Sequence, residues 1–420
     1  MLKDSNSESF LGPYRVLDLT TEYGFIGGKL MGDLGADVIK IEPPGGDQAR
    51  NLGPFFQGQK DPEKSLYWTS FNLNKRGVTL NLETHEGQKL FKRLVESADF
   101  ILESQELGYL DSLGIGYESL SKINPRIIMS SITPFGQSGP YKDFKSSDLI
   151  SMAMGGYLFT TGDPDRPPVR ISFPVSYCHA GSEAAAAAMM AHWYRERTGE
   201  GQHIDISMQE CITWTLMNTT AHWNIGQNNI SRGGSIRTNP TTGVATKGMW
   251  PTKDGYVTFN IAGGPARADG MRYLVNWMDE YGMASDFIKE LKWEDLFIPD
   301  MTQEIYDGIA RDIGPFLLTQ TTNDLYKRAV IGKILLAPIT TPPISLESPQ
   351  LIDRESFVEI DYPEFGRKIT YPGPFVKMSS WAPVISRKAP LIGEHNKEIY
   401  CTELGISAKE FIELEKNGVI

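Results

Sequence analysis

Residues 78–103, VTLNLETHEGQKLFKRLVESADFILE, contain a predicted strand, a helix and a second strand in immediate succession. The runs at 78–82 and 99–103 are short and apolar, as buried strands are, whereas 84–98 has the apolar spacing of an amphipathic helix. Two strands joined by a helix run parallel in one sheet, because parallel neighbours need a crossover connection. The stretch therefore predicts an α/β fold.

The same alternation extends over the first half of the chain. Strand-like runs occur at 15–19 (RVLDL), 36–42 (ADVIKIE) and 126–132 (RIIMSSI). Their order with the intervening helical segments predicts βαβ units in a parallel, Rossmann-like sheet. The alanine-rich segment 180–202 predicts a long helix that ends at Gly199 and Gly201, and 203–210 predicts a strand leading into another helix.

A tract rich in Gly, Asn, Ser and Thr begins after Trp223 and indicates a long loop at a domain boundary. We expect a large domain at 1–224, a smaller α/β domain at 225–335, and a third section, 336–420, with paired strand-like runs and a final charged helix. A chain of 420 residues is long enough for two such cores.

Composition excludes several classes of function. The net charge of -11 argues against nucleic-acid binding and against binding to an anionic membrane. The N-terminal residues have no apolar signal-peptide core and no run is long enough to span a bilayer, so we expect a cytoplasmic protein. The spacing of the three cysteines and six histidines predicts neither a disulfide nor a metal site.

Local motifs give little positive evidence. The EPPGGD run at 42–47 matches neither a dinucleotide-binding nor a phosphate-binding glycine loop, so a turn is the better interpretation. Cys178 and His179 are adjacent, and adjacent side chains point in different directions, so they do not form a nucleophile and base pair.

Longer blocks of sequence are more informative. They are RVLDLT, MGDLGADVIKIEPPGGDQAR, FNLNKRGVTLNLETHEG, LGIGYESLSKINPRIIMSSITPFGQSGPYKD, TTGDPDRPP, ERTGEGQHIDISMQE and PLIGEH, in that order. Together they resemble the class III CoA-transferases. The resemblance implies that residues 336–420 return to the large Rossmann-like domain, that the smaller domain is inserted, and that two chains interlock as rings.

The resemblance also implies a mechanism. In this family an aspartate attacks an acyl-CoA thioester, forms a mixed anhydride and then an enzyme-bound thioester, and CoA passes to an acceptor acid. CoA is thus a substrate, and no permanently bound cofactor is expected. The family places the aspartate in a run of the type V-A-D-x-x-A-G, which here reads VSYCHAG at 175–181. Tyr177 occupies the position, and a phenol with a pKa of about 10 is mostly protonated at neutral pH and cannot form an anhydride.

Family positions for CoA binding differ as well. Where the family has Glu-Asn-Phe, then Pro-Gly and an arginine, this chain has Glu103, Ser104 and Gln105, then Leu107, Gly108 and Ser112. Pro43 replaces an arginine, and Glu22 adds negative charge that would repel CoA phosphates. Leu80, Lys145 and Asp148 remain as candidate CoA contacts. Ser147 stands where the racemase branch of the family has its histidine, so racemization is not expected.

We interpret the chain as the non-catalytic subunit of a heteromeric class III CoA-transferase, paired with a paralogue that keeps the aspartate. Within the family, two-subunit architecture is associated with benzylsuccinate CoA-transferase of anaerobic toluene degradation, so succinyl-CoA and benzylsuccinate are the expected substrates. One alternative is a homomeric enzyme that uses Asp148, Asp165 or Glu183, although helix-surface, capping and turn roles fit these acids better. The other alternative is a non-enzymatic scaffold.

Overall fold

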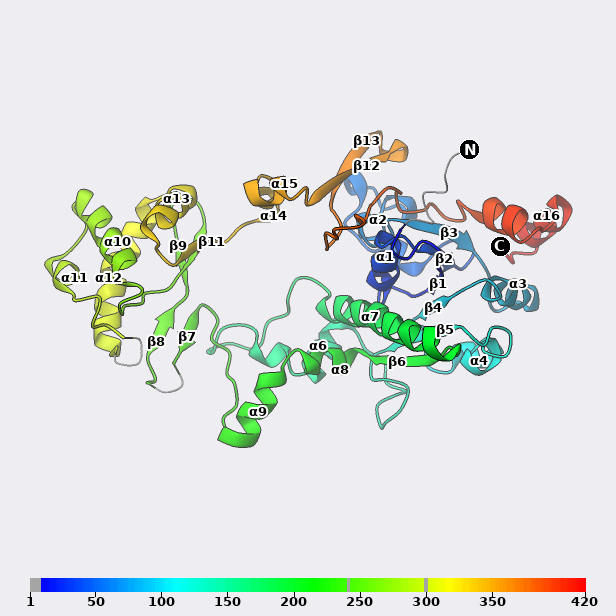
Figure 1. The fold of residues 1–420 in the computed structure, drawn as a ribbon, viewed down its shortest axis with the longest axis horizontal. Helices are drawn as coiled ribbons and strands as arrows, with labels where there is room; N and C mark the ends of the chain where they lie inside the picture. Colours follow the sequence, from blue (N-terminus) through cyan, green and yellow to red (C-terminus); the bar gives the residue numbers. More distant parts are fainter. Residues whose placement is uncertain (1–8, 240–241, 298–300) are drawn as a thin grey trace. The chain divides into compact units, whose positions relative to one another are not determined.

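The computed structural model describes residues 9–239, 242–297 and 301–420, and the chain divides into two compact units. Unit 1 contains the described residues up to Leu158, together with Arg170–Asn228 and Pro349–Ile420. Unit 2 contains Phe159–Val169 and Asn229–Ser348. The elements of both are labelled in Figure 1.

A six-stranded parallel sheet forms the centre of unit 1, with strand order β3-β2-β1-β4-β5-β6. Its strands are β1 (Arg15–Leu19), β2 (Asp37–Glu42), β3 (Lys75–Thr79), β4 (Phe100–Glu103), β5 (Ile128–Thr133) and β6 (His203–Ser207). This is the strand order of doubly wound dinucleotide-binding folds. The predicted α/β, Rossmann-like class is confirmed.

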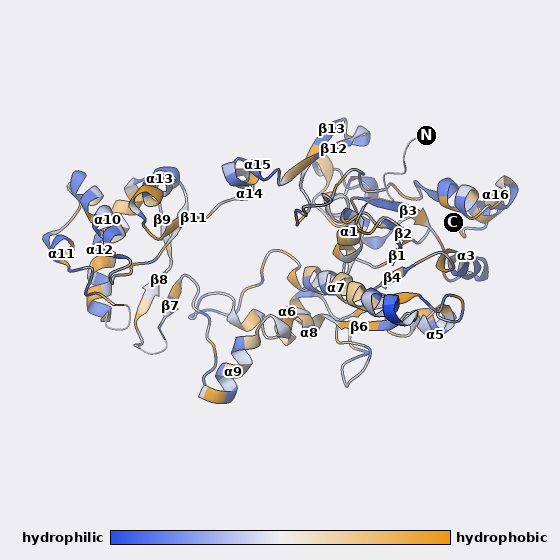
Figure 2. Cartoon of the chain, in the orientation of Figure 1, coloured by the Kyte–Doolittle hydropathy of each residue, from blue (hydrophilic) through white to orange (hydrophobic). Residues whose placement is uncertain are grey.

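Helices cover both faces of this sheet, because successive side chains of a strand point to opposite faces. On one face, Val16 and Ile128 pack with α1 (Phe25–Asp33) and α7 (Val175–Thr198). On the other, Leu17 and Ile101 pack with α3 (His85–Val95) and α16 (Ala408–Lys416). The C-terminal helix therefore shares a core with the N-terminal strands. In Figure 2, α7 changes from hydrophobic colouring to blue at its basic C-terminal end.

Unit 1 contains further short helices and a hairpin. The helices are α2 (Leu66–Phe71), α4 (Tyr109–Ser112), α5 (Tyr117–Leu120), α6 (Asp148–Met154), α8 (Met208–Trp214), α9 (Met217–Gly226) and α15 (Pro349–Asp353). Strands β12 (Phe357–Tyr362) and β13 (Arg367–Pro372) form the antiparallel hairpin. Within the described residues, no helix combines the length and apolar character needed to cross a membrane.

Unit 2 has its own core, in which Trp250, Trp277 and Phe316 are buried. Its antiparallel sheet has the order β11-β10-β9, and β7 pairs with β8 in a separate hairpin. The strands are β7 (Ile236–Thr238), β8 (Ala245–Lys247), β9 (Met249–Pro251), β10 (Tyr256–Phe259) and β11 (Leu336–Pro338). The helices are α10 (Ala268–Glu280), α11 (Asp286–Glu290), α12 (Gln303–Thr319), α13 (Thr322–Gly332) and α14 (Pro342–Leu346).

Three local predictions differ from the structure. The strand expected at 78–82 lies at Lys75–Thr79. It begins earlier than expected because the charged Lys75 is buried, where its ammonium group donates a hydrogen bond to Asp18 Oδ2 at 2.7 Å. The helix expected from 180 begins at Val175. The loop expected after Trp223 contains β7, which is stabilised by pairing with β8 rather than by its own composition.

Candidate functional site

Tyr177 lies in the first turn of α7, where this helix crosses α1 at close range. A Cβ added to Gly181 would be 2.6 Å from Ile26 Cγ2 and 3.2 Å from the Gly24 carbonyl oxygen, so only glycine permits this approach. The crossing holds Tyr177 against Tyr23, with ring centroids 4.7 Å apart. The position that the sequence motif assigns to the family's aspartate is therefore expected to hold an aromatic pair, Tyr177 and Tyr23.

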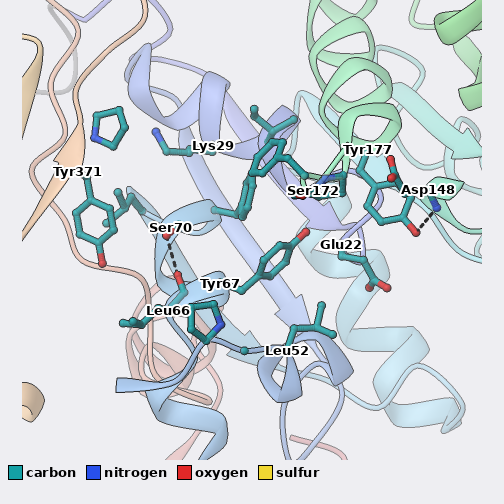
Figure 3. A pocket seen from close by; sticks show the side chains of 18 of the residues that line it. Glu22, Lys29, Leu52, Leu66, Tyr67, Ser70, Asp148, Ser172, Tyr177 and Tyr371 are labelled. Atoms are coloured by element: carbon teal, nitrogen blue, oxygen red, sulfur yellow. Dashed lines mark hydrogen bonds between the residues drawn. The ribbon is translucent and has the colours of Figure 1, made fainter. Parts of the chain in front are cut away.

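The Tyr177 hydroxyl forms a specific bond with the N-terminus of α6. It accepts a hydrogen bond from the Asp148 backbone N–H at 2.9 Å, as Figure 3 shows. In return, Asp148 Oδ1 accepts from the Ser176 backbone N–H at 3.0 Å and from Ser176 Oγ at 2.9 Å. The first turns of α6 and α7 thus satisfy each other's free N–H groups, which explains why α7 begins before Tyr177.

Neither Tyr177 nor its neighbour Cys178 is activated as a nucleophile. Burial raises the pKa of the Tyr177 phenol well above its usual value, and the nearby Tyr23 and Glu22 raise it further. Burial, with a contribution from Asp148, raises the pKa of the Cys178 thiol to about 11. Both groups are protonated at neutral pH, whereas nucleophilic catalysis requires a lowered pKa or an adjacent base.

Tyr177 borders a cavity of about 1070 Å³ whose walls are mainly aromatic and aliphatic (Figure 3). Its aromatic lining residues are Tyr67, Phe71, Phe173, Tyr177, Tyr371 and Phe375. Its cations have carboxylate neighbours: Lys29 lies 2.5 Å from Asp33, and Arg170 Nε lies 3.9 Å from Asp148 Oδ2. The cavity has the size of a ligand site.

Two carboxylates line this cavity that the sequence did not suggest as catalytic alternatives, Asp33, which pairs with Lys29, and Glu22. Glu22 follows β1 by three residues, at the carboxyl edge of the sheet where ligands of doubly wound folds bind, and this position was the available signal. Burial raises the pKa of Glu22, and the charge of Asp47 raises it further. In Figure 3 its side chain lies near Tyr177 and Tyr67.

The three acids suggested by the sequence lie in different environments. Asp148 is 5% exposed and holds the helix ends together, as described above. Glu183 lies further along α7 and is 3.8 Å from His179. Asp165 belongs to unit 2, where its side chain is 73% exposed and 3.8 Å from Arg166. Within unit 1, the structure brings Asp148 next to Tyr177.

The candidate CoA positions are occupied by protein contacts. Leu80 is 2% exposed and belongs to the core between the sheet, α3 and α16. Lys145 is exposed, but its Nζ lies 2.9 Å from Glu106 Oε1, so the charge available to a phosphate is partly neutralised. The EPPGGD run forms a turn in which the Gly46 N–H donates to the Pro43 carbonyl at 2.9 Å.

Glu103, at the end of β4, is a buried carboxyl in a small polar cavity of about 150 Å³. Burial raises its pKa to about 7, although its Oε2 accepts a hydrogen bond from the Gln105 N–H at 2.7 Å. Ser131 and His203 line the same cavity and lie 2.8 Å apart through Oγ and Nε2. In the described residues no group of three or more His, Cys, Asp or Glu side chains could hold a metal ion.

Comparison with known proteins places this chain in a family. The model of "CoA-transferase family III" matches residues 11–396. The chain is 32% identical to succinyl-CoA:(R)-benzylsuccinate CoA-transferase subunit BbsE of Thauera aromatica over 97% of each chain. It is 31% identical to succinyl-CoA--D-citramalate CoA-transferase of Chloroflexus aurantiacus, over 94% of this chain and 93% of that one.

Solved structures of other proteins have a similar fold. A CaiB/BaiF family protein of Brucella suis has a TM-score of 0.79 at 28% identity, covering 93% of this chain and 98% of that one. The protein Rv3272 of Mycobacterium tuberculosis, at 23% identity and a TM-score of 0.70, has the same fold, covering 92% of this chain and 97% of that one. With the family model spanning most of its length and both units, the chain belongs to CoA-transferase family III.

Proposed function

We propose that this chain is the non-catalytic subunit of a heteromeric class III CoA-transferase. The observation that carries the proposal is Tyr177, which stands at the family's aspartate position and whose hydroxyl caps α6. The protonated phenol cannot form the acyl anhydride. A paralogue that keeps the aspartate would supply the nucleophile, and the two chains would interlock in the manner expected of the family.

The state of the CoA positions supports the same conclusion. Glu106 pairs with Lys145, and Leu80 is enclosed in the core. Glu22 places a carboxyl group beside the missing nucleophile. A site selected for binding a polyanionic thioester would gain cations rather than acids. We infer that CoA is a substrate of the complex and binds the partner's site.

The substrates are proposed from the relatives. BbsE is by name a subunit of an enzyme acting on succinyl-CoA and (R)-benzylsuccinate, and other relatives are named for succinyl-CoA with citramalate, mesaconate or glutarate. We propose succinyl-CoA as donor and a dicarboxylic acid, with benzylsuccinate as first choice, as acceptor. A cytoplasmic location fits these metabolites.

The test compares this chain purified alone with the same chain co-purified with its aspartate-bearing paralogue. CoA transfer from succinyl-CoA to benzylsuccinate and other dicarboxylates would be followed by chromatography of the thioesters. We expect activity only in the co-purified pair and none in the isolated chain. This activity should disappear when the partner's aspartate is changed to asparagine. Activity of the isolated chain at a comparable rate would overturn the proposal.

Glu22 favours one competing function, a homomeric enzyme with a displaced nucleophile, because it brings a carboxyl group into the cavity beside Tyr177. Amide variants of this chain, purified without the paralogue, test this possibility, because no partner aspartate is then present to carry the activity. The variants are Glu22→Gln, Asp148→Asn, Asp165→Asn and Glu183→Gln. We expect any residual transfer by the isolated chain to persist within about twofold in each, whereas a nucleophile replaced by its amide would lose several orders of magnitude.

A further inference from the structure

A second cavity, in unit 2, has the charge expected of an anion-binding site. It has a volume of about 510 Å³, and its lining includes residues of β7, of β8 and of the loop that leads from β10 into α10. Two arginines line it, Arg237 on β7 and Arg267 immediately before α10. No carboxylate of the described residues lines it, although the whole chain has a net charge of -11.

The two guanidinium groups are not engaged elsewhere. Neither side chain forms an ion pair or hydrogen bond with another of the described residues, and Arg237 bonds to Thr246 Oγ1 only through its backbone carbonyl. Asp269, two residues after Arg267, pairs instead with Arg272, whose Nη2 lies 2.6 Å from Asp269 Oδ1. Both arginines are exposed, and two guanidinium groups without a partner among the described residues at one cavity favour the binding of an anion.

The backbone around the cavity is held in a defined position. A Cβ at Gly263 would lie 2.3 Å from the Leu296 carbonyl oxygen, so this loop approaches its neighbour as closely as backbone allows. The Gly264 N–H donates to the Trp293 carbonyl at 2.7 Å. On the opposite wall, Arg237 is paired in register with Thr246. Both arginines therefore extend from fixed backbone positions rather than from free loops.

We propose that this cavity binds a dianionic ligand through Arg237 and Arg267. Guanidinium groups recognise planar carboxylates and phosphates through paired N–H donors. Asn260 and Thr246 contribute neutral polar groups to the lining of the cavity. Phe297 and Leu335 contribute apolar surface, which could contact the hydrocarbon part of an organic acid. Dicarboxylic acids and phosphate-bearing nucleotides share the dianionic chemistry. The site lies within unit 2 and does not depend on the state of Tyr177.

The test is isothermal titration calorimetry of the full chain, alone and co-purified with its paralogue, at constant ionic strength. The probes are succinate, benzylsuccinate, inorganic phosphate and adenosine 3′,5′-bisphosphate. We expect saturable binding of at least one dianion. Binding of the dicarboxylates alone identifies an acid substrate as the source, and binding of the phosphates alone identifies a nucleotide.

Variants connect any binding to the two arginines. Arg237→Gln and Arg267→Gln are each expected to weaken binding by about tenfold or more, the effect of losing a charged hydrogen-bond donor. Arg267→Lys keeps the charge and should lose less than Arg267→Gln. The matched control is Arg311→Gln on α12, since Arg311 is exposed, unpaired among the described residues, and outside the cavity.

Two results would overturn the proposal. One is the absence of saturable binding of every probe to folded wild-type chain at about 10 mM, on the order of the weakest useful affinity. The other is unchanged binding by the double glutamine variant. Circular dichroism of each variant would verify folding. Because no transfer activity enters this test, its outcome is independent of whether the chain is a catalytic subunit.

Discussion

Replacing Tyr177 with phenylalanine tests whether this residue has a structural rather than a catalytic role. The substitution keeps the ring that packs on Tyr23 and removes the oxygen that accepts from the Asp148 N–H at 2.9 Å. Asp148 is 5% exposed and borders the cavity, so its N–H loses its partner in a site that is largely enclosed by protein and open to water on the cavity side. An unsatisfied buried donor costs about 1–3 kcal/mol, and relief from burying the phenol offsets part of this cost. We expect α6 to lose about 1–2 kcal/mol of local stability.

Hydrogen exchange measured by mass spectrometry gives the most direct readout, because opening of α6 is a local event. A loss of about 1–2 kcal/mol corresponds to roughly 5–30-fold faster exchange of the peptide that contains Asp148. CoA transfer by the co-purified pair should change less than about twofold, since a residue outside the chemistry does not alter transition-state stabilisation.

The matched control is Tyr67→Phe. Tyr67 lines the same cavity, but its hydroxyl has no hydrogen bond among the described residues. This variant should exchange at the wild-type rate. The reasoning is refuted if both variants exchange alike, or if Tyr177→Phe lowers transfer more than about tenfold while the fold is intact.

Three further changes have defined outcomes. Burial raises the pKa of Glu103 from 4.5 to about 7, so the wild-type carboxyl contributes stability below pH 4.5 that is lost as pH rises through 7. Glu103→Gln lacks this titration, so its stability relative to the wild type should be about 3 kcal/mol more favourable at pH 8 than at pH 4. Urea denaturation of both proteins at both pH values measures the difference, and an unchanged pH dependence would contradict the expectation. Lys75→Met should destabilise unit 1 by about 3–5 kcal/mol, since it leaves Asp18 buried without the ammonium group 2.7 Å away. Lys40 is also buried, and against the effect of burial its charge, like that of Lys75, lowers the pKa of Asp18. A loss under about 1 kcal/mol in thermal unfolding would show that Lys40 alone is enough to compensate Asp18. Tyr177→Asp should create no transfer in the isolated chain, and appreciable succinyl-CoA-dependent activity would disprove the proposed loss of the CoA cradle.

Much of the fold was predictable because its information is local. RVLDL at 15–19 coincides with β1, and the segment 84–98 contains α3, since short apolar runs and helical spacing depend on residues close in sequence. The third strand was misplaced for the opposite reason. Lys75 and Arg76 look like loop residues until the partners that neutralise them, Asp18 on β1 and Asp37 on β2, are known.

The candidate site was predictable in position but not in structure. A resemblance to family motifs identified Tyr177, because the motif is a short run of adjacent residues. Its bond to Asp148 joins residues 29 apart, and no periodicity encodes it. Glu22 was recognised as added charge, whereas its place in the Tyr177 cavity depends on how α1 and α7 cross.

The bond between Tyr177 and Asp148 also explains why recovery of a catalytic aspartate would need more than one substitution. A phenol oxygen extends much further from the backbone than an aspartate carboxylate, so Tyr177→Asp would leave the Asp148 N–H without its acceptor. The new carboxylate would face two acids, Glu22 and Asp148, in a partly buried site, and both conditions raise its pKa and favour the unreactive neutral form. The first turn of α7 therefore contributes stability through a helix-capping bond that an aspartate at position 177 would not make.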